Sequence, residues 1–315
     1  MSGFAFASWA SRIPTIKAEF DLNEAELGSL LLALPISSLV GLPISGWLVS
    51  KYNSRYPLLV SFVFFSLALS LIGAADSLLL LIAGLCLFSF SMRIVNISMN
   101  TQSIALQRSF PRKILGSFHG LWSTGGLAGV GFSTLLIYYE VSMLLHLFMV
   151  CLLGLLMSVA AFQFLLKKDR SPVGNKLRLG KPDKFILYLG LLVFFASLCE
   201  GGMFDWSGVY FKEVVNQDLF TLGYFIFMLF MALSRFFSDR AIEKLGMQKM
   251  FINSAAFISG GILLMVVFPS FWPALIGFSM VGIGVAAIVP MIFSLAGTSK
   301  KYSPGMAVSI IATYG

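Results

Sequence analysis

The sequence predicts an all-α membrane protein with many spans. Hydrophobic residues make up 58% of the 315 positions and charged residues only 11%, whereas a soluble domain is about half apolar and about a quarter charged. The mean hydropathy is +0.89. Apolar runs of about 20 residues, long enough to cross a ~30 Å hydrocarbon core, recur along the whole chain. The net charge of +8 does not indicate nucleic-acid binding, because the basic residues are scattered between the apolar runs.

Nine apolar runs are long enough to be complete spans. They lie at 27–49, 57–74, 77–100, 114–138, 142–166, 185–203, 219–238, 249–268 and 272–297. Two further pieces are incomplete: "MSGFAFASWA" is too short to cross, and "GMAVSIIATYG" stops after about half a helix. No basic n-region or cleavage site follows Met1, so we interpret the first piece as the outer half of a first span rather than a signal peptide. We therefore expect the chain to be a fragment of a longer protein.

The basic residues predict the orientation of these spans. If the first segment exits the membrane, 18 of the 22 basic residues fall on one side. The eighteen are Lys51 and Arg55; Arg108, Arg112 and Lys113; seven from Lys167 to Lys184; Arg235, Arg240, Lys244 and Lys249; and Lys300 and Lys301. Arg12, Lys17 and Lys212 fall on the other side, and Arg93 lies within a span. By the positive-inside rule, loops 51–55, 108–113, 167–184, 239–249 and 298–303 face the cytoplasm.

The loop "KKDRSPVGNKLRLGKPDK" (167–184) is the natural linker between two helical bundles. It is basic, carries Pro and Gly, and divides the chain into an N-terminal bundle (1–166) and a C-terminal bundle (185–315). "SWASRIPTIKAEF" (8–20) pairs with "DWSGVYFKEVVN" (205–216), which indicates a repeat of about 190 residues. Parallel repeats with a substrate site at their interface are typical of one large class of transporters.

The loop after the second span resembles a signature of the major facilitator superfamily, Gly-x-Leu-x-Asp-Arg-x-Gly-Arg-Arg/Lys. In "GWLVSKYNSR" the matching positions include Gly46, Lys51 and Arg55, whereas Ser50 and Asn53 depart from the signature. The second copy carries Arg235, Asp239 and Arg240. "FASWASRIPTIK", "SFHGLWSTGGLAGVG", "EGGMFDWSGVYFK" and "MAVSIIATYG" are similar to the bacterial YbjJ-like inner-membrane branch.

This resemblance implies the major facilitator fold, with two pseudo-symmetric six-helix bundles and twelve spans in the family. It implies a multi-pass protein of the bacterial inner membrane that carries a small-molecule substrate, and it makes the two signature copies a cytoplasmic gate motif. We expect a monomer in the lipid bilayer, with no cofactor, no metal and no nucleic-acid partner.

Arg93, Asn96 and Asn100 are candidate substrate-binding residues. They fall at i, i+3 and i+7, on one stripe of a helix, and an intramembrane charge is costly unless it faces a cavity or a partner. In the superfamily this span lines the central cavity. The alternatives are that these side chains bond neighbouring helices, or that Asn100 already lies at the cytoplasmic interface. His119, with Trp122 one turn later, can form a pocket for an anion or a hydrogen-bonding group. A packing histidine is the alternative for His119, and His146 reads as structural.

Glu200 and Asp205 interrupt an apolar run and differ in depth. Counted from Lys184 at 1.5 Å per residue, Glu200 is about 24 Å deep and Asp205 about 31 Å. Glu200 is therefore embedded, and Asp205 is expected at the outer rim. A partly desolvated carboxyl can take up and release a proton as access alternates, so Glu200 is the candidate for proton coupling. Gly201 and Gly202 weaken the helix and allow a hinge.

Asp205 has a candidate partner in Arg12, at the outer end of the pseudo-equivalent first span. We hypothesise that the two form an outer gate contact that breaks when the site faces outward. By the same depth arithmetic, Glu200 and Arg93 are not level, which argues against a static pair between them.

These observations favour a secondary active transporter that moves a small polar or anionic solute by alternating access, coupled to protons through Glu200. The alternative is a non-transporting membrane sensor or binding protein of the same fold. An enzyme is the weakest interpretation, because the sequence has no H-E-x-x-H, no G-x-S-x-G and no Walker loop. Without a nucleotide site, an ion gradient is the expected energy source.

Overall fold

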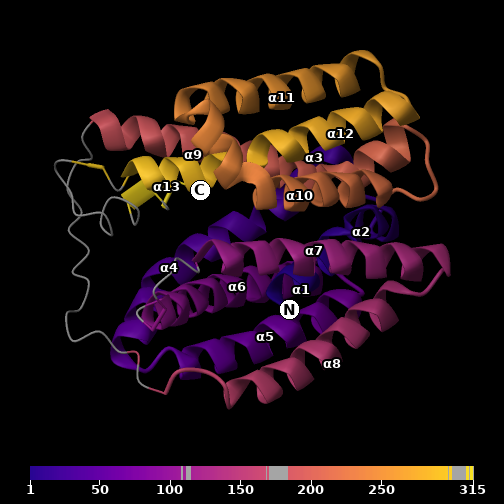
Figure 1. Ribbon diagram of the computed structural model, residues 1–315. Helices are drawn as coiled ribbons and strands as arrows, with labels where there is room; N and C mark the ends of the chain where they lie inside the picture. Colours follow the sequence, from indigo (N-terminus) through magenta and orange to yellow (C-terminus); the bar gives the residue numbers. More distant parts are fainter. Residues whose placement is uncertain are drawn as a thin grey trace. The chain divides into compact units, whose positions relative to one another are not determined.

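The computed structural model describes residues 1–107, 109–110, 115–167, 169, 184–296, 298–299, 310–311 and 313–314. Over these ranges every regular element is a helix, which confirms the all-α prediction (Figure 1). The chain divides into two compact units, Met1–Lys176 and Leu177–Gly315. The predicted linker 167–184 lies almost wholly outside the described residues.

The helices of each unit follow the apolar runs of the sequence. In the first unit they are α1 (Ser2–Ala10), α2 (Ile13–Glu19), α3 (Glu24–Leu31), α4 (Ala33–Lys51), α5 (Arg55–Gly73), α6 (Leu78–Gln107), α7 (Leu115–Tyr138) and α8 (Met143–Phe162). In the second unit they are α9 (Lys184–Val209), the π-helix η1 (Tyr210–Val214), α10 (Leu222–Leu245), α11 (Met247–Val267), α12 (Phe271–Ala286) and α13 (Ile288–Ala296).

The predicted spans correspond to these helices, with one clear difference in length. Among the described residues, eight helical stretches are long and apolar enough to cross a membrane, and Leu222–Ser238 is a shorter apolar one. The predicted end of a span at residue 203 is wrong, because the candidate span continues from Lys184 to Val214. Asp205 therefore has nine further helical residues beyond it, and the whole stretch of 31 residues is longer than a ~30 Å hydrocarbon core requires.

Two predicted spans are interrupted, and a proline explains each interruption. A proline ring inside a helix clashes with the carbonyl of the residue four positions earlier. Pro35 stands four residues after Leu31, where α3 ends. Pro290 stands four residues after Ala286, where α12 ends. In both places a second helix starts after a single intervening residue, so the chain continues in the same apolar stretch.

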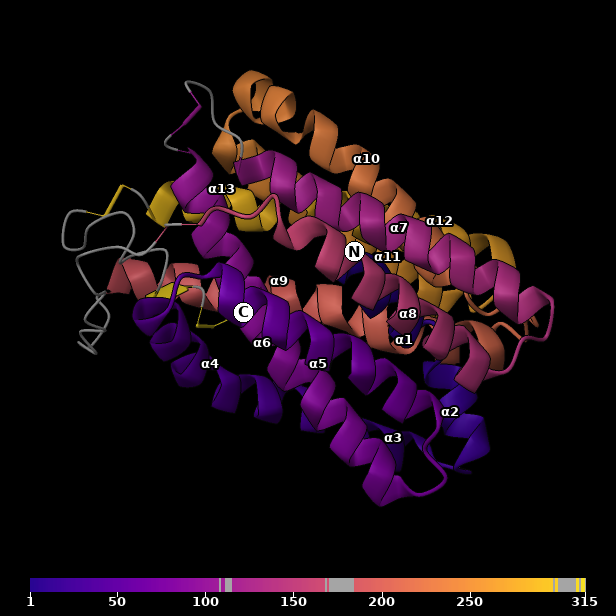
Figure 2. The ribbon, with the colours of Figure 1, turned by 90° about the horizontal axis from the view of Figure 1, so that it is seen from below.

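The two units repeat one packing order. In the first unit, α4 and α5 both pack along α6; in the second, α10 and α11 both pack along α12 (Figure 2). The equivalent helices lie about 190 residues apart, as the internal similarity predicts. The first unit adds α8 against α5 and α1 against α7.

Glycines bring α1 and α7 into backbone contact. A Cβ at Gly3 would overlap the carbonyl oxygen of Trp122, and a Cβ at Gly129 would overlap that of Phe4. Only residues without a side chain fit such a crossing. Gly125 lies on the same line, because a Cβ there would be 3.5 Å from the Phe4 nitrogen. Gly125 and Gly129 thus allow α1 to approach α7 closely, whereas a Cβ at Gly120 would meet nothing within 4 Å.

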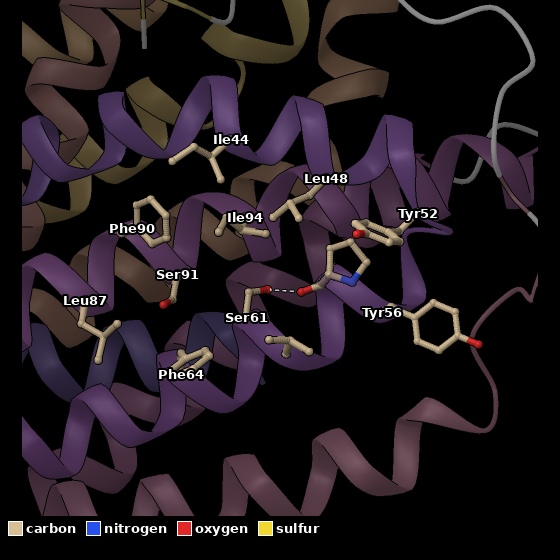
Figure 3. A pocket seen from close by; sticks show the side chains of 12 residues that line it. Ile44, Leu48, Tyr52, Tyr56, Ser61, Phe64, Leu87, Phe90, Ser91 and Ile94 are labelled. Atoms are coloured by element: carbon tan, nitrogen blue, oxygen red, sulfur yellow. Dashed lines mark hydrogen bonds between the residues drawn. The ribbon is translucent and has the colours of Figure 1, made fainter.

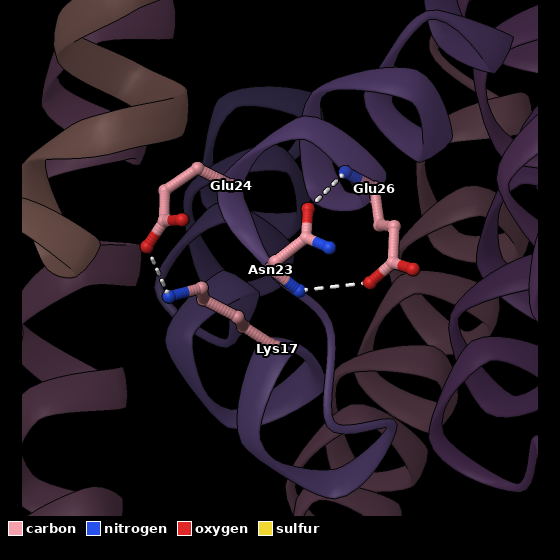
Figure 4. A network of polar contacts seen from close by, with 4 residues as sticks. All are labelled: Lys17, Asn23, Glu24 and Glu26. Carbon is pink, nitrogen blue, oxygen red and sulfur yellow. Dashed lines mark hydrogen bonds and ion pairs between the residues drawn. The ribbon is translucent and has the colours of Figure 1, made fainter.

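A small polar network fixes the connection between α2 and α3. Asn23 caps α3 by accepting from the Glu26 nitrogen at 2.9 Å, and the Glu26 carboxylate accepts from the Asn23 nitrogen at 2.9 Å (Figure 4). This reciprocal capping box satisfies two free donors at the start of the helix. Lys17 Nζ lies 3.0 Å from Glu24 Oε1 and ties α2 to α3.

Candidate functional site

Arg93 is a half-buried cation in the middle of a candidate span. It lies on α6, ten residues before the end of the apolar stretch Leu78–Ser103, which corresponds to about 15 Å. Its Nε donates to Ser38 Oγ on α4 at 2.6 Å. Within the described part of the chain, no carboxylate pairs with Arg93 and its two terminal nitrogens have no acceptor. The Ser38 bond therefore orients a guanidinium that keeps its charge uncompensated.

The asparagines predicted to accompany Arg93 lie on the same unbroken helix. Asn96 is half-buried, and Asn100 is exposed. The structure thus brings Arg93 and Asn96 onto one partly buried stripe of α6 and leaves Asn100 towards the surface of the first unit. The side chain of the next candidate, His119, lies outside the described residues.

Trp122 belongs to a chain of aromatic rings that runs from α7 into the core of the first unit. Its ring centroid lies 6.1 Å from that of Phe6, and Phe6 lies 5.8 Å from Trp9. Trp9 in turn lies 5.5 Å from Phe88 on α6. Trp9 is fully buried, and its Nε1 has no hydrogen-bond acceptor in the described part of the protein. The aromatic wall predicted at Trp122 is therefore anchored by α1 as well as by α7.

Glu200 has a charged partner within its own unit. Its Oε1 lies 3.3 Å from Arg235 Nη2, with Glu200 on α9 and Arg235 on α10. The two side chains are only 17% and 19% exposed. Both residues lie in apolar helical stretches, Lys184–Val214 and Leu222–Ser238. Arg235 lies within the predicted span 219–238, three residues inside the end of the apolar part of α10.

The surroundings of this pair contain further polar groups. Tyr224, in the first turn of α10, has a buried hydroxyl with no hydrogen-bond partner among the described residues. Its ring packs at 5.6 Å from Phe204, next to Asp205. Ser207 Oγ is also buried and has no hydrogen-bond partner in the described part of the chain. The helix is unbroken at Gly201 and Gly202, and the irregular turns come later, in η1.

Arg12 is held inside the first unit by a chain of hydrogen bonds. Its Nε donates to His146 Nδ1 at 2.9 Å, and its Nη2 donates to the Val141 carbonyl at 2.6 Å. An Nδ1 that accepts requires the neutral ring to carry its proton on Nε2, which faces Ser133 Oγ at 3.3 Å. Ser133 Oγ donates onward to the Gly129 carbonyl at 2.7 Å.

Arg12 remains a cation in this setting. Burial lowers the pKa of its guanidinium to about 10, and the charge of Glu19 opposes that shift. At neutral pH the group is therefore still protonated, and His146 supplies a neutral acceptor for it. The interpretation of His146 as structural fits its complete burial in this network.

The comparisons with known proteins agree with this architecture. The whole chain, residues 1–315, matches the family model described as Major Facilitator Superfamily. The chain belongs to the major facilitator superfamily. Superfamily relatives include an uncharacterised transporter from Yersinia pestis, 30% identical over 317 residues that cover 100% of this chain and 82% of the relative. Membrane protein MosC from Rhizobium meliloti is 31% identical over 100% of this chain and 77% of its own length.

The solved structure of the nucleoside transporter NupG has the same fold. Its TM-score to this chain is 0.71 at 15% sequence identity, and the match covers 99% of this chain and 84% of NupG. The protein is accordingly a multi-pass membrane transporter of the superfamily and not an enzyme.

The superfamily signature between α4 and α5 is held by aromatic rings rather than by ion pairs. Lys51 Nζ lies 4.7 Å from the Trp47 ring centroid, and the Arg55 guanidinium lies 4.0 Å from that of Phe162. A Cβ at Gly46 would meet nothing within 4 Å. In the second copy, Arg240 is exposed, and the Asp239 side chain lies outside the described residues.

A carboxylate that the sequence analysis missed completes this end of the first unit. Asp169 follows α8 and accepts from the Ser54 nitrogen at 3.0 Å and from Gln102 Nε2 at 3.0 Å; it also accepts from the Ser54 hydroxyl. Gln102 Oε1 accepts from the Leu166 nitrogen at 2.9 Å. The contacts span 115 and 67 positions, so no local spacing in the sequence indicates them.

Proposed function

We propose that the protein is a secondary active transporter that moves a small polar or anionic solute by alternating access, with protons as the coupling ion. The observation that carries this proposal is the Glu200–Arg235 ion pair between two apolar helices of the second unit. Intramembrane ion pairs are costly and mark ion pathways or relays more often than structural contacts.

The pair provides a two-state element for coupling. When Glu200 is ionised, its attraction to Arg235 holds α9 against α10; when Glu200 is protonated, that attraction is lost. A proton bound on one side of the membrane therefore favours one arrangement of these helices over the other. Asp205, five residues after Glu200 on α9, offers a second carboxylate for passing the proton on, and Tyr224 packs against the neighbouring Phe204.

Arg93 supports an anionic or strongly polar substrate. It is a cation in mid-span with no carboxylate partner among the described residues, and Ser38 orients it. Asn96 on the same helix stripe supplies amide donors and acceptors, and we include Asn100, His119 and Trp122 in the proposed binding surface. NupG is a nucleoside transporter, so nucleosides belong in the panel of solutes to be tested.

Orientation and gating complete the proposal. We place five loops in the cytoplasm, because the positive-inside rule supports this orientation: 51–55, 108–113, 167–184, 239–249 and 298–303. We place the protein in the bacterial inner membrane as a monomer. Gly46, Lys51, Arg55, Arg235, Asp239 and Arg240 then form the cytoplasmic gate motif.

We retain Arg12 and Asp205 as the outer gate. In the structure Arg12 uses Nε and Nη2 for His146 and Val141, so a bond to Asp205 would use Nη1. If the double exchange Arg12→Asp with Asp205→Arg fails to recover transport lost in either single variant, the gate pair is wrong.

The function is tested in proteoliposomes that contain the purified protein and a trapped pH dye. A panel of monosaccharides, nucleosides and small carboxylates is first screened for ligands that raise the thermal midpoint of the protein. Each stabilising solute is then added outside the vesicles. We expect at least one to cause proton movement together with solute uptake. Uptake that leaves the internal pH unchanged for every solute would reject proton coupling.

A further inference from the structure

A groove of about 500 Å³ lies between α4 and α5 in the first unit (Figure 3). Both helices pack along α6, but they touch each other at few positions, so α6 forms the floor of the space between them. Leu87, Phe90, Ser91 and Ile94 lie on this floor, at the i, i+3, i+4 and i+7 spacing of one helix face. The groove therefore results from the way α4 and α5 diverge.

The body of the groove is apolar and open along its length. Ile44 and Leu48 of α4 form one wall, and Val60 and Phe64 of α5 form the other. Val60 and Phe64 are 54% and 48% exposed, so the groove is not an enclosed cavity. The hydroxyl of Ser61 is already satisfied, because it donates to the Pro57 carbonyl at 2.6 Å. All three helices belong to candidate membrane spans. A long hydrocarbon chain suits this surface.

One end of the groove is different in chemistry. Tyr52 and Tyr56 line that end (Figure 3). Lys51 Nζ lies 5.5 Å from the Tyr52 ring centroid, and the Arg55 guanidinium lies 5.5 Å from that of Tyr56. In the described part of the chain no carboxylate pairs with Lys51, which lies against the Trp47 and Tyr52 rings.

Among the described residues, Arg55 likewise has no carboxylate partner. Its Nη2 reaches the Phe162 carbonyl at 3.4 Å, whereas its Nε is buried with no acceptor in the described structure. The carboxylate next to this loop, Asp169, is engaged by Ser54 and Gln102. Two cations with no carboxylate partner in the described structure thus lie next to the tyrosines at one end of an apolar groove.

We propose that this groove binds an acyl chain of an anionic phospholipid, whose phosphate lies against Lys51 and Arg55. The apolar body fits the chain, the two tyrosines at one end have the amphipathic rings that favour a membrane interface, and the two cations match the negative headgroup. A zwitterionic lipid fits the groove equally well but lacks the net charge that the cations select. This site does not depend on which solute the protein transports.

The test compares two lipids with identical acyl chains, phosphatidylglycerol and phosphatidylcholine, bound to the purified full chain and counted by native mass spectrometry. We expect phosphatidylglycerol to bind more tightly. Lys51→Gln should weaken its binding about fivefold, since one basic residue near an anionic surface contributes about 1 kcal/mol. Lys244→Gln, at an exposed lysine in the last turn of α10, is the matched control and should leave it unchanged.

A second variant tests the groove itself. Val60→Trp places a large side chain on the exposed wall and should reduce the binding of both lipids, while Lys51→Gln affects phosphatidylglycerol alone. Glycerol phosphate, which has the headgroup charge and no acyl chain, should not compete. Equal affinity for the two lipids, an equal effect of the Lys51 and Lys244 variants, or undiminished binding to the Val60→Trp protein would each overturn the proposal.

Discussion

Arg235 Nη2 of α10 lies 3.3 Å from Glu200 Oε1 of α9, and both residues are in the apolar stretches of their helices. The proposed proton coupling depends on this ion pair. Replacing one partner by a neutral residue leaves the other charge in a poorly solvated environment without its ion pair. Replacing both partners removes both charges and avoids this cost.

The first prediction is a thermodynamic coupling between these two residues. Arg235→Gln should lower the free energy of unfolding by about 1–3 kcal/mol, because Glu200 loses its partner. The double variant with Glu200→Gln should recover part of that loss. Thermal midpoints of the four proteins in one detergent measure the coupling. Strictly additive effects would show that the two side chains do not interact.

The second prediction concerns the buried Arg12–His146 bond. His146→Phe leaves Arg12 Nε without its acceptor and should cost about 1–3 kcal/mol. His146→Asn keeps an oxygen near Arg12 and should cost less. Ser133→Ala removes only the outer contact, at 3.3 Å, and is the matched control. The order of thermal midpoints should be wild type, Ser133→Ala, His146→Asn, His146→Phe. An equal cost for Ser133→Ala and His146→Phe would contradict the inferred network.

The third prediction separates two glycines of α7. Gly129→Ala should destabilise the first unit by about 1–3 kcal/mol, because its Cβ would overlap the Phe4 carbonyl of α1. Gly120→Ala meets open space and should be neutral or slightly stabilising. Limited proteolysis and thermal melting report the difference. If both variants melt at the same temperature, α1 and α7 do not cross at Gly129.

The fourth prediction is whether replacing Arg93 raises or lowers the thermal midpoint of the protein. No carboxylate pairs with Arg93 in the described residues, so Arg93→Gln should leave the thermal midpoint of the unliganded protein unchanged or raise it. The same change should abolish the thermal shift caused by an anionic ligand. Ser38→Ala, which loosens the guanidinium but keeps its charge, should weaken that shift less. A destabilised Arg93→Gln protein would indicate a structural role instead.

Much of the fold can be predicted from the sequence because membrane spans must be long, apolar and helical to satisfy their backbone groups. The helix breaks near Leu32 and Ala287 are also indicated by the local sequence, because Pro35 and Pro290 determine where the preceding helices end. The extension of α9 beyond Asp205 was not predicted, because the polar residues in that stretch are typical of a loop.

Partners across the bundle were beyond sequence reasoning. His146 has no polar neighbour at helical spacing, and its partner Arg12 lies 134 positions away. Arg235 reads as part of a loop signature, yet the register of α9 against α10 places it opposite Glu200, 35 positions earlier. Glu200 was found because a single carboxylate stands out in an apolar run; its partner depends on tertiary packing, which local patterns do not encode.

The most direct test of proton coupling through Glu200 is the Glu200→Gln variant, assayed in proteoliposomes with a solute that the wild-type protein transports. Two rates are measured in parallel: exchange of labelled for unlabelled solute at equal pH, and accumulation driven by a pH gradient. We expect exchange to continue in the Glu200→Gln protein, whereas accumulation driven by the pH gradient is lost. Accumulation at the wild-type level would contradict the central role of Glu200 in coupling.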